Sequence, residues 1–83
     1  MVVHGRVQGV FFRDSLRQRA QSRRVAGWVT NRSDGAVEAV FEGDGDAVES
    51  LVEYCREGPR SASVEDVEVF DEEPEGLSGF EIR

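Results

Sequence analysis

Two glycines and an arginine near the start of the chain have the types and the spacing of an anion site. In the stretch GRVQGVFFR, residues 5–13, Gly5 and Gly9 lie between an apolar run and a helical pattern. Glycine permits backbone angles that a Cβ resists, so the intervening N–H groups can turn toward one point. The first turn of the helix adds unpaired N–H groups, and Arg13 can extend a planar guanidinium fork to the same ligand. These features predict a phosphate-binding loop.

The same stretch also fits a structure without a ligand. Short glycine patterns recur by chance, so on spacing alone a strand-to-helix turn with a solvated Arg13 is slightly favoured over a phosphate site. His4 has the chemistry of a general base, but a single histidine on a strand is more often packed or solvated. Asn31 can donate and accept hydrogen bonds at the end of a strand, yet on local sequence a turn-forming asparagine is favoured there.

The spacing of apolar residues predicts the elements that would position these groups. Valine-rich and alternating patterns predict strands, and apolar residues at four-residue spacing predict amphipathic helices. The expected strands cover residues 2–7, 25–31, 36–42, 62–70 and 79–83. The expected helices cover residues 12–24 and the stretch from an N-cap within residues 43–46 to a stop at Gly58-Pro59. This order, βαββαβ with a terminal strand, predicts a ferredoxin-like α+β fold: a single domain over residues 1–83 with one antiparallel sheet and two helices on one face.

Local signals mark the connections between these elements. The Asp34-Gly35 pair predicts a hairpin turn, because it supplies the positive φ angles that a short turn needs. A phase change between Val64 and Val67 indicates a bulge in the fourth strand. The charge run over residues 71–76 is expected to be a solvated connection.

The composition argues against several classes of function. The chain has 83 residues and a net charge of −7, and its 10 basic residues are all arginine. This acidic surface disfavours broad binding of nucleic acid or of an anionic membrane, and the third expected strand lacks the paired aromatics of an RNA-recognition domain. No apolar run approaches a membrane span, and no Cys/His cluster indicates a metal. Cys55 falls on the apolar face of the second helix, which predicts a core thiol in a reducing cytoplasm.

Two long stretches of the sequence resemble the signatures of a known family. Residues 5–13 are similar to the first signature of the acylphosphatases, and residues 27–38 (GWVTNRSDGAVE) are similar to the second. The resemblance continues through Glu42-Gly43, the Gly58-Pro59 helix stop and residues 79–83, so it covers essentially the whole chain. It implies hydrolysis of the mixed anhydride of an acyl phosphate to a carboxylate and inorganic phosphate, without a metal or other cofactor.

The resemblance also implies roles for individual residues. Arg13 matches the phosphate-binding arginine of the family, and Asn31 matches its water-positioning asparagine. The backbone N–H groups expected on the phosphoryl oxygens are those of Gly5, Arg6, Val7, Gln8, Gly9, Val10 and Phe11. Because an acyl phosphate has a good leaving group, positioning and charge stabilisation suffice, and the sequence identifies no general base. The expected protein is a cytoplasmic monomer whose partners are a small acyl phosphate and inorganic phosphate, the latter as product and inhibitor.

Two departures and one rival interpretation accompany the resemblance. Very little sequence precedes the first signature, and no aromatic residue follows Arg83, so the sheet edges are expected to be less well buttressed.

The rival interpretation is a non-catalytic anion-binding module, like the acylphosphatase-like domains of larger maturation enzymes. The end of the chain at residue 83 argues against it, and hydrolysis of benzoyl phosphate, followed by absorbance, separates this module and a nucleic-acid binder from an enzyme.

We expect salt to stabilise the protein, because 17 acidic residues face 10 arginines and no lysine. This composition fits a saline cytoplasm, although a GC-rich genome also favours arginine over lysine. The Debye length falls from about 10 Å at 0.1 M to about 3 Å at 1 M salt, so screening relieves repulsion in the folded state. The midpoint of thermal unfolding, Tm, should therefore rise and activity be better retained in molar potassium chloride than in dilute buffer. A flat or falling Tm would remove the halophile hypothesis.

Overall fold

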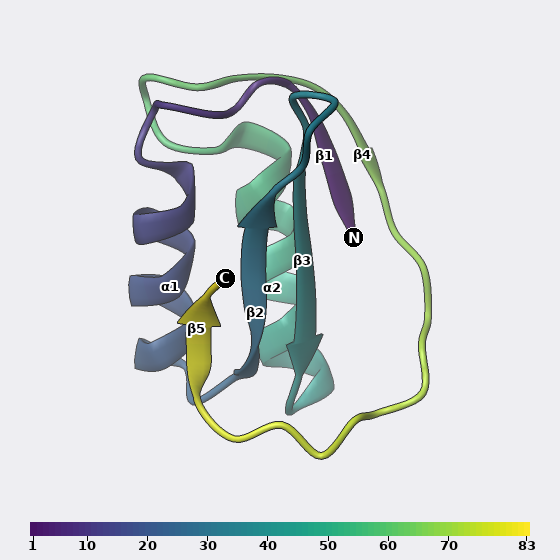
Figure 1. Ribbon diagram of the computed structural model, residues 1–83. Helices are drawn as coiled ribbons and strands as arrows, with labels where there is room; N and C mark the ends of the chain where they lie inside the picture. The colour runs from purple at the N-terminus through teal and green to yellow at the C-terminus, as the bar shows by residue number, and fades with distance from the viewer.

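Five strands form one sheet, and two helices cover one of its faces (Figure 1). The computed structural model describes residues 1–83. Its strands are β1 (Val2–Arg6), β2 (Ala26–Asn31), β3 (Val37–Glu42), β4 (Ser63–Glu68) and β5 (Phe80–Ile82), and its helices are α1 (Phe12–Ser22) and α2 (Gly45–Glu57). Every expected element is present, most of them a residue or two shorter than the sequence pattern, and the ferredoxin-like α+β class is confirmed.

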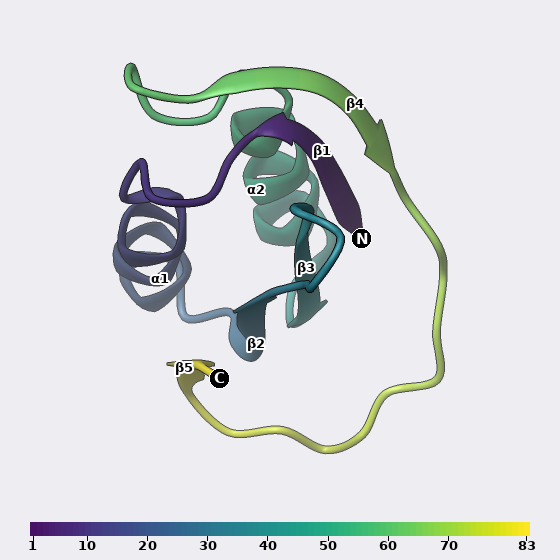
Figure 2. The same cartoon turned by 45° about the horizontal axis from the view of Figure 1, so that its top comes forward.

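The sheet is mixed, which corrects the expectation of an antiparallel sheet. Its strand order is β4-β1-β3-β2-β5, and β5 lies parallel to β2 while all other neighbours are antiparallel. The reason is the connection over residues 69–79. It runs from the β4 edge around to the opposite edge, so β5 enters the sheet in the same direction as β2 (Figure 2).

The core lies between the helices and the sheet. Phe12, Leu16 and Ala20 on α1 are almost fully buried, as their four-residue spacing predicted, and Leu51 and Cys55 bury the facing side of α2. Each large apolar side chain removed from water contributes about 1.5–3 kcal/mol to folding. Within the expected N-cap segment of α2 the cap residue is Asp44, but its side chain makes no capping hydrogen bond.

A bulge in β4 explains the first glycine of the loop stretch. His4 lies opposite Asp66 but Gly5 lies opposite Val64, so Glu65 is the extra residue, as the phase change predicted. Gly5 has φ +126°, and a Cβ there would lie 2.2 Å from the Ser63 carbonyl oxygen. Glycine at this position is therefore required by the close approach of β4.

The chain ends on the β5 edge, where hydrogen bonds and a stacked cation hold the last residue. The Arg83 N–H donates to the Val29 carbonyl at 2.9 Å, and the Thr30 hydroxyl donates to the Arg83 carbonyl at 2.9 Å. The Arg83 guanidinium lies 4.9 Å from the centre of the Trp28 ring, a distance at which a cation is attracted to an aromatic face. These contacts hold Arg83 against the β2 side of the β5 edge.

Residues 71–76 are exposed, as the charge run predicted, but one carboxylate attaches the connection over residues 69–79 to the sheet. Glu42, at the end of β3, accepts N–H donors from Glu75 at 2.6 Å, Gly76 at 3.1 Å and Leu77 at 3.0 Å. These hydrogen bonds stabilise the ionised form and lower the pKa of Glu42 below its ordinary 4.5. The end of the connection that leads into β5 is therefore attached to the sheet.

Glu42→Gln should lower Tm at pH 7, because one of the two oxygens becomes an NH2 donor facing N–H donors. Since the folded-state pKa is depressed, the stabilisation is present above the unfolded pKa and is lost as the pH falls through the folded value. Thermal unfolding followed by circular dichroism should show a wild-type advantage at pH 7 that shrinks below about pH 4.5. Glu72→Gln is the control, since Glu72 is exposed on the same connection; equal Tm losses in the two variants would contradict this account.

Candidate active site

Three connections that are far apart in the sequence meet at one end of the molecule (Figure 1). They are the loop between β1 and α1, the turn between β2 and β3, and the segment between α2 and β4. The Gln8 side chain hydrogen-bonds to the β2–β3 turn, and the Ser61 hydroxyl donates to the Val10 carbonyl at 2.8 Å. The loop that the sequence singled out is therefore held from both sides.

The backbone of this loop enters the left-handed region at two residues. Gly9 has φ +71° and Phe11 has φ +61°, both in the left-handed region. A bulky residue held there costs on the order of 1–3 kcal/mol, and such residues cluster at functional sites. Phe11 is also the N-cap of α1, is 75% exposed and makes no side-chain capping bond. Left-handed residues ahead of an uncapped helix start are typical of loops whose N–H groups bind an anion.

A cavity of about 340 Å³ lies against this loop and the start of α1. Arg13 lines it, is half-buried and forms no ion pair with any carboxylate. The neighbouring Asp14 is 3.4 Å from the Arg17 guanidinium, which offsets its charge. The complete lining is Val7, Gly9, Phe11, Phe12, Arg13, Asp14 and Ile82.

The structure separates the residues of the expected phosphate loop into two groups. Val7, Gly9, Phe11 and Arg13 line the cavity, whereas Gly5, Arg6, Gln8 and Val10 do not. Gly5 belongs to β1, and the Arg6 guanidinium donates to the Ser61 carbonyl at 3.2 Å. The side chain of Gln8 contacts the β2–β3 turn, and that of Val10 is buried in the core.

Asn31 is the last residue of β2 and carries an unusual buried group. It lies opposite Val37, and its Oδ1 is buried without a hydrogen-bond partner. Asn31 does not line the 340 Å³ cavity. It lies two residues beyond Val29, which pairs with Ile82 of β5, and Ile82 lines that cavity. Because side chains alternate along a strand, Asn31 faces the same side of the sheet as the buried Val29. A buried acceptor without a partner is costly in a folded protein and marks a place where a water or ligand can bind.

Ile82 is the cavity residue most distant in sequence from the loop, and the sequence did not indicate it. It follows the 69–79 connection at the end of the chain and reaches the loop only because β5 inserts beside β2. No residue type or spacing signalled it.

His4, considered above as a general base, does not line the cavity. Its Nε2 lies 2.6 Å from Glu68 Oε2, between β1 and β4.

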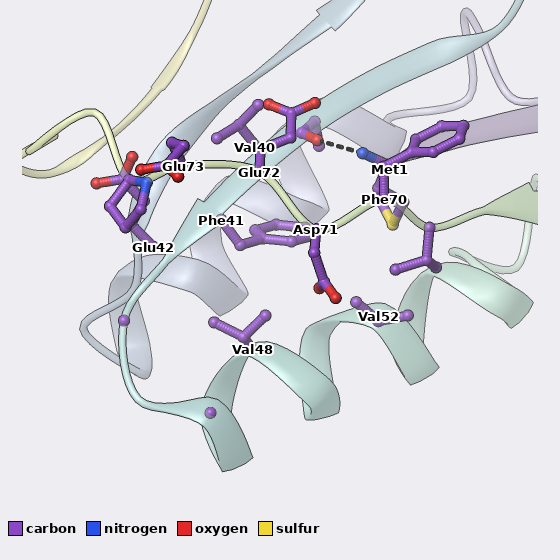
Figure 3. Close-up of a pocket in the computed structure, with 15 residues that line it drawn as sticks. Met1, Val40, Phe41, Glu42, Val48, Val52, Phe70, Asp71, Glu72 and Glu73 are labelled. Atoms are coloured by element: carbon purple, nitrogen blue, oxygen red, sulfur yellow. Dashed lines mark hydrogen bonds between the residues drawn. The ribbon is translucent and has the colours of Figure 1, made fainter.

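A second cavity, of about 360 Å³, lies elsewhere in the molecule between β3, α2 and the 69–79 connection (Figure 3). Phe41, Val48 and Val52 give it an apolar wall. Its rim carries the carboxylates of Glu42, Asp71, Glu72 and Glu73, and no arginine lines it. The Met1 ammonium there donates to the Ala39 carbonyl at 3.0 Å. This negative surrounding repels an anion, which disfavours this cavity as an anion site.

The rest of the molecule offers neither a metal-binding cluster nor a reactive thiol. No cluster of three or more His, Cys, Asp or Glu side chains is placed to hold a metal ion. Burial raises the pKa of the Cys55 thiol to about 12, so it stays protonated in the core. Neither helix has the length and the apolar content that a membrane crossing requires.

Comparison with known proteins identifies the family of the chain. The acylphosphatase family model matches residues 1–82. The chain is 61% identical over 83 residues to an acylphosphatase of Rubrobacter xylanophilus, covering 98% of this chain and 74% of that protein. It is 58% identical over 81 residues to an acylphosphatase of Haloarcula marismortui, covering 98% and 89%. The crystal structure of acylphosphatase from Bacillus subtilis matches with a TM-score of 0.93 at 42% identity, over 99% of this chain and 92% of that one. The chain therefore belongs to the acylphosphatase family of hydrolases, which act on acyl phosphates.

Proposed function

We propose that residues 1–83 act as one hydrolytic unit in which the β1–α1 loop and Arg13 bind the phosphoryl group of an acyl phosphate and Asn31 positions the attacking water. The observation that supports this most strongly is Arg13 itself. It is half-buried, has no carboxylate partner and lines a cavity beside a loop with left-handed residues at Gly9 and Phe11. A guanidinium in that setting has its five N–H donors available for an anion.

The charge distribution of phosphoryl transfer suits these groups. The transition state spreads negative charge over the equatorial phosphoryl oxygens, and the carboxylate is a good leaving group. Backbone N–H groups and a bidentate Arg13 would neutralise this charge from fixed positions, so little reorganisation is needed during the reaction. Of the expected backbone donors, Val7, Gly9 and Phe11 line the cavity.

The unpartnered Oδ1 of Asn31 supports its role toward water. An acceptor that holds one O–H of a water fixes the direction from which the water oxygen approaches. Asp14 is the one carboxylate in the cavity lining, and the Arg17 guanidinium lies against it. We therefore assign the proton of the attacking water to a phosphoryl oxygen of the substrate.

The remaining expectations complete the proposal. The enzyme would work as a cytoplasmic monomer on small acyl phosphates, with inorganic phosphate as product and competitive inhibitor. The acidic surface of net charge −7 would serve solubility, including in a saline cytoplasm, while Arg13 supplies the local positive charge.

Replacing the two proposed site residues should separate phosphate binding from water positioning. Arg13→Ala should lower kcat by 10²–10³-fold or more and weaken inhibition by phosphate, a range typical of losing a preorganised donor. Asn31→Ala should lower kcat to a similar extent but leave phosphate inhibition largely unchanged. Arg13→Lys should also be severely impaired, because an ammonium cannot reproduce the planar fork.

Steady-state hydrolysis of benzoyl phosphate, with inorganic phosphate as inhibitor, measures these effects. Circular dichroism must show that each variant keeps its fold. Near-normal turnover in either folded alanine variant would overturn the assignment of the site.

Activity should not depend on a metal ion. Arg13 and the N–H groups of the loop supply the positive charge that a magnesium ion provides in other phosphoryl-transfer enzymes. Benzoyl phosphate hydrolysis should be unchanged after dialysis against EDTA. A loss of activity that added magnesium or zinc restores would show that the mechanism is wrong.

A further inference from the structure

The side chain of Gln8 connects the phosphate loop to the turn that follows Asn31. Its Nε2 donates to the Arg32 carbonyl at 2.7 Å and to the Ala36 carbonyl at 2.9 Å. Both amide hydrogens are therefore used, one at each end of the β2–β3 turn. The Arg32 N–H donates to the same Ala36 carbonyl at 2.8 Å, so Gln8 contacts the turn where it closes.

These are the only hydrogen bonds between the loop and this turn. The other side-chain bond to the loop comes from Ser61 on the opposite side, and no backbone hydrogen bond joins residues 7–11 to residues 32–36. The turn is closed internally by the Asp34 carboxylate, which accepts the Ala36 N–H at 3.0 Å. Without Gln8 the turn would keep its shape, but no hydrogen bond would hold it to the loop.

We propose that Gln8 is a positioning residue that fixes the distance and angle between the phosphate loop and Asn31. The inference rests on the proposed function, because it needs Asn31 and the loop to act on the same substrate. Arg32 directly follows Asn31, so a bond to the Arg32 carbonyl restrains the backbone that carries the asparagine. A misplacement of about 1 Å between reacting groups costs on the order of 10²-fold in rate.

The amide of Gln8 is suited to this task because both of its partners are acceptors. An ionised carboxylate of the same length has no donor and would face two carbonyl oxygens, which is unfavourable. A protonated carboxylic acid has one O–H donor and would restore one of the two bonds. The carbonyls would raise the pKa of a glutamate placed here above its ordinary value of about 4.3, since they disfavour the charged form.

Gln8→Glu and Gln8→Met test the proposal. At pH 7.5 both variants should lower kcat for benzoyl phosphate by on the order of 10²-fold. The inhibition constant of inorganic phosphate should stay within about threefold of wild type, because Arg13 and the Ser61 contact are intact. As the pH falls toward 4, the kcat of Gln8→Glu relative to wild type at the same pH should recover. Gln8→Met, which has similar length and no titratable group, should show no recovery. Gln21→Glu makes the same chemical change on an exposed position of α1 and should behave as wild type.

Three outcomes would overturn the proposal. One is a folded Gln8→Met with kcat near wild type. A second is a loss of kcat matched by an equal loss of phosphate affinity and a lower Tm, which indicates a purely structural side chain. The third is a Gln8→Glu variant whose relative kcat does not rise at acid pH. If Arg13→Ala and Asn31→Ala are inactive but Gln8→Met is normal, only the role of Gln8 is wrong; if those alanine variants are active, the proposed function itself fails.

Discussion

The orientation of the peptide groups in the β1–α1 loop is the constraint on which the candidate site depends. A loop attracts an anion only when its N–H groups face the ligand and its carbonyls are held elsewhere. The C=O and N–H of one planar peptide point in opposite directions. The Ser61 hydroxyl on the Val10 carbonyl therefore directs the Phe11 N–H away from Ser61. Phe11 lies in the left-handed region, a strained backbone conformation that persists where the surrounding structure holds it, and the loop here is held from both sides.

The sheet places these contacts within reach of one another. β1 lies between β3 and β4, so the loop that leaves β1 emerges between the β2–β3 turn and the α2–β4 segment. The bulge at Glu65 lets β4 follow β1 up to that loop, and Gly5 makes room for it. The glycine that looked like part of an anion cradle thus supports the site through strand pairing.

The C-terminal part of the chain completes the cavity by a different route. Glu42 holds the end of the 69–79 connection, β5 then joins the outer edge of β2, and Ile82 becomes a wall of the site. The strongly acidic connection lies beside the second cavity, whose rim is negative. Arg13 makes no ion pair and lines the other cavity, so a molecule with net charge −7 keeps an unpaired guanidinium at the candidate site.

The sequence by itself determined the elements and the identity of the chemistry. Apolar periodicity located both helices and all five strands, because burial of one face requires that spacing. The resemblance of residues 5–13 and 27–38 indicated the family and named Arg13 and Asn31. The elements and the family could be inferred because periodicity and contiguous motifs are local properties of the chain, whereas the roles of Arg13 and Asn31 stay predictions.

Only the tertiary structure decided the parallel entry of β5, the contribution of Ile82 and the two hydrogen bonds of Gln8. Each of these contacts joins residues that are distant in sequence. The residue types alone, an isoleucine in a strand and a glutamine in a loop, do not predict which residues they contact. It also showed that Gly5 must be glycine because the Ser63 carbonyl leaves no room for a Cβ. The strand that makes this close approach is distant in sequence, so the sequence alone does not reveal it. Such contacts depend on strand order and register, which the sequence pattern constrains only loosely because the same elements can be paired in several ways.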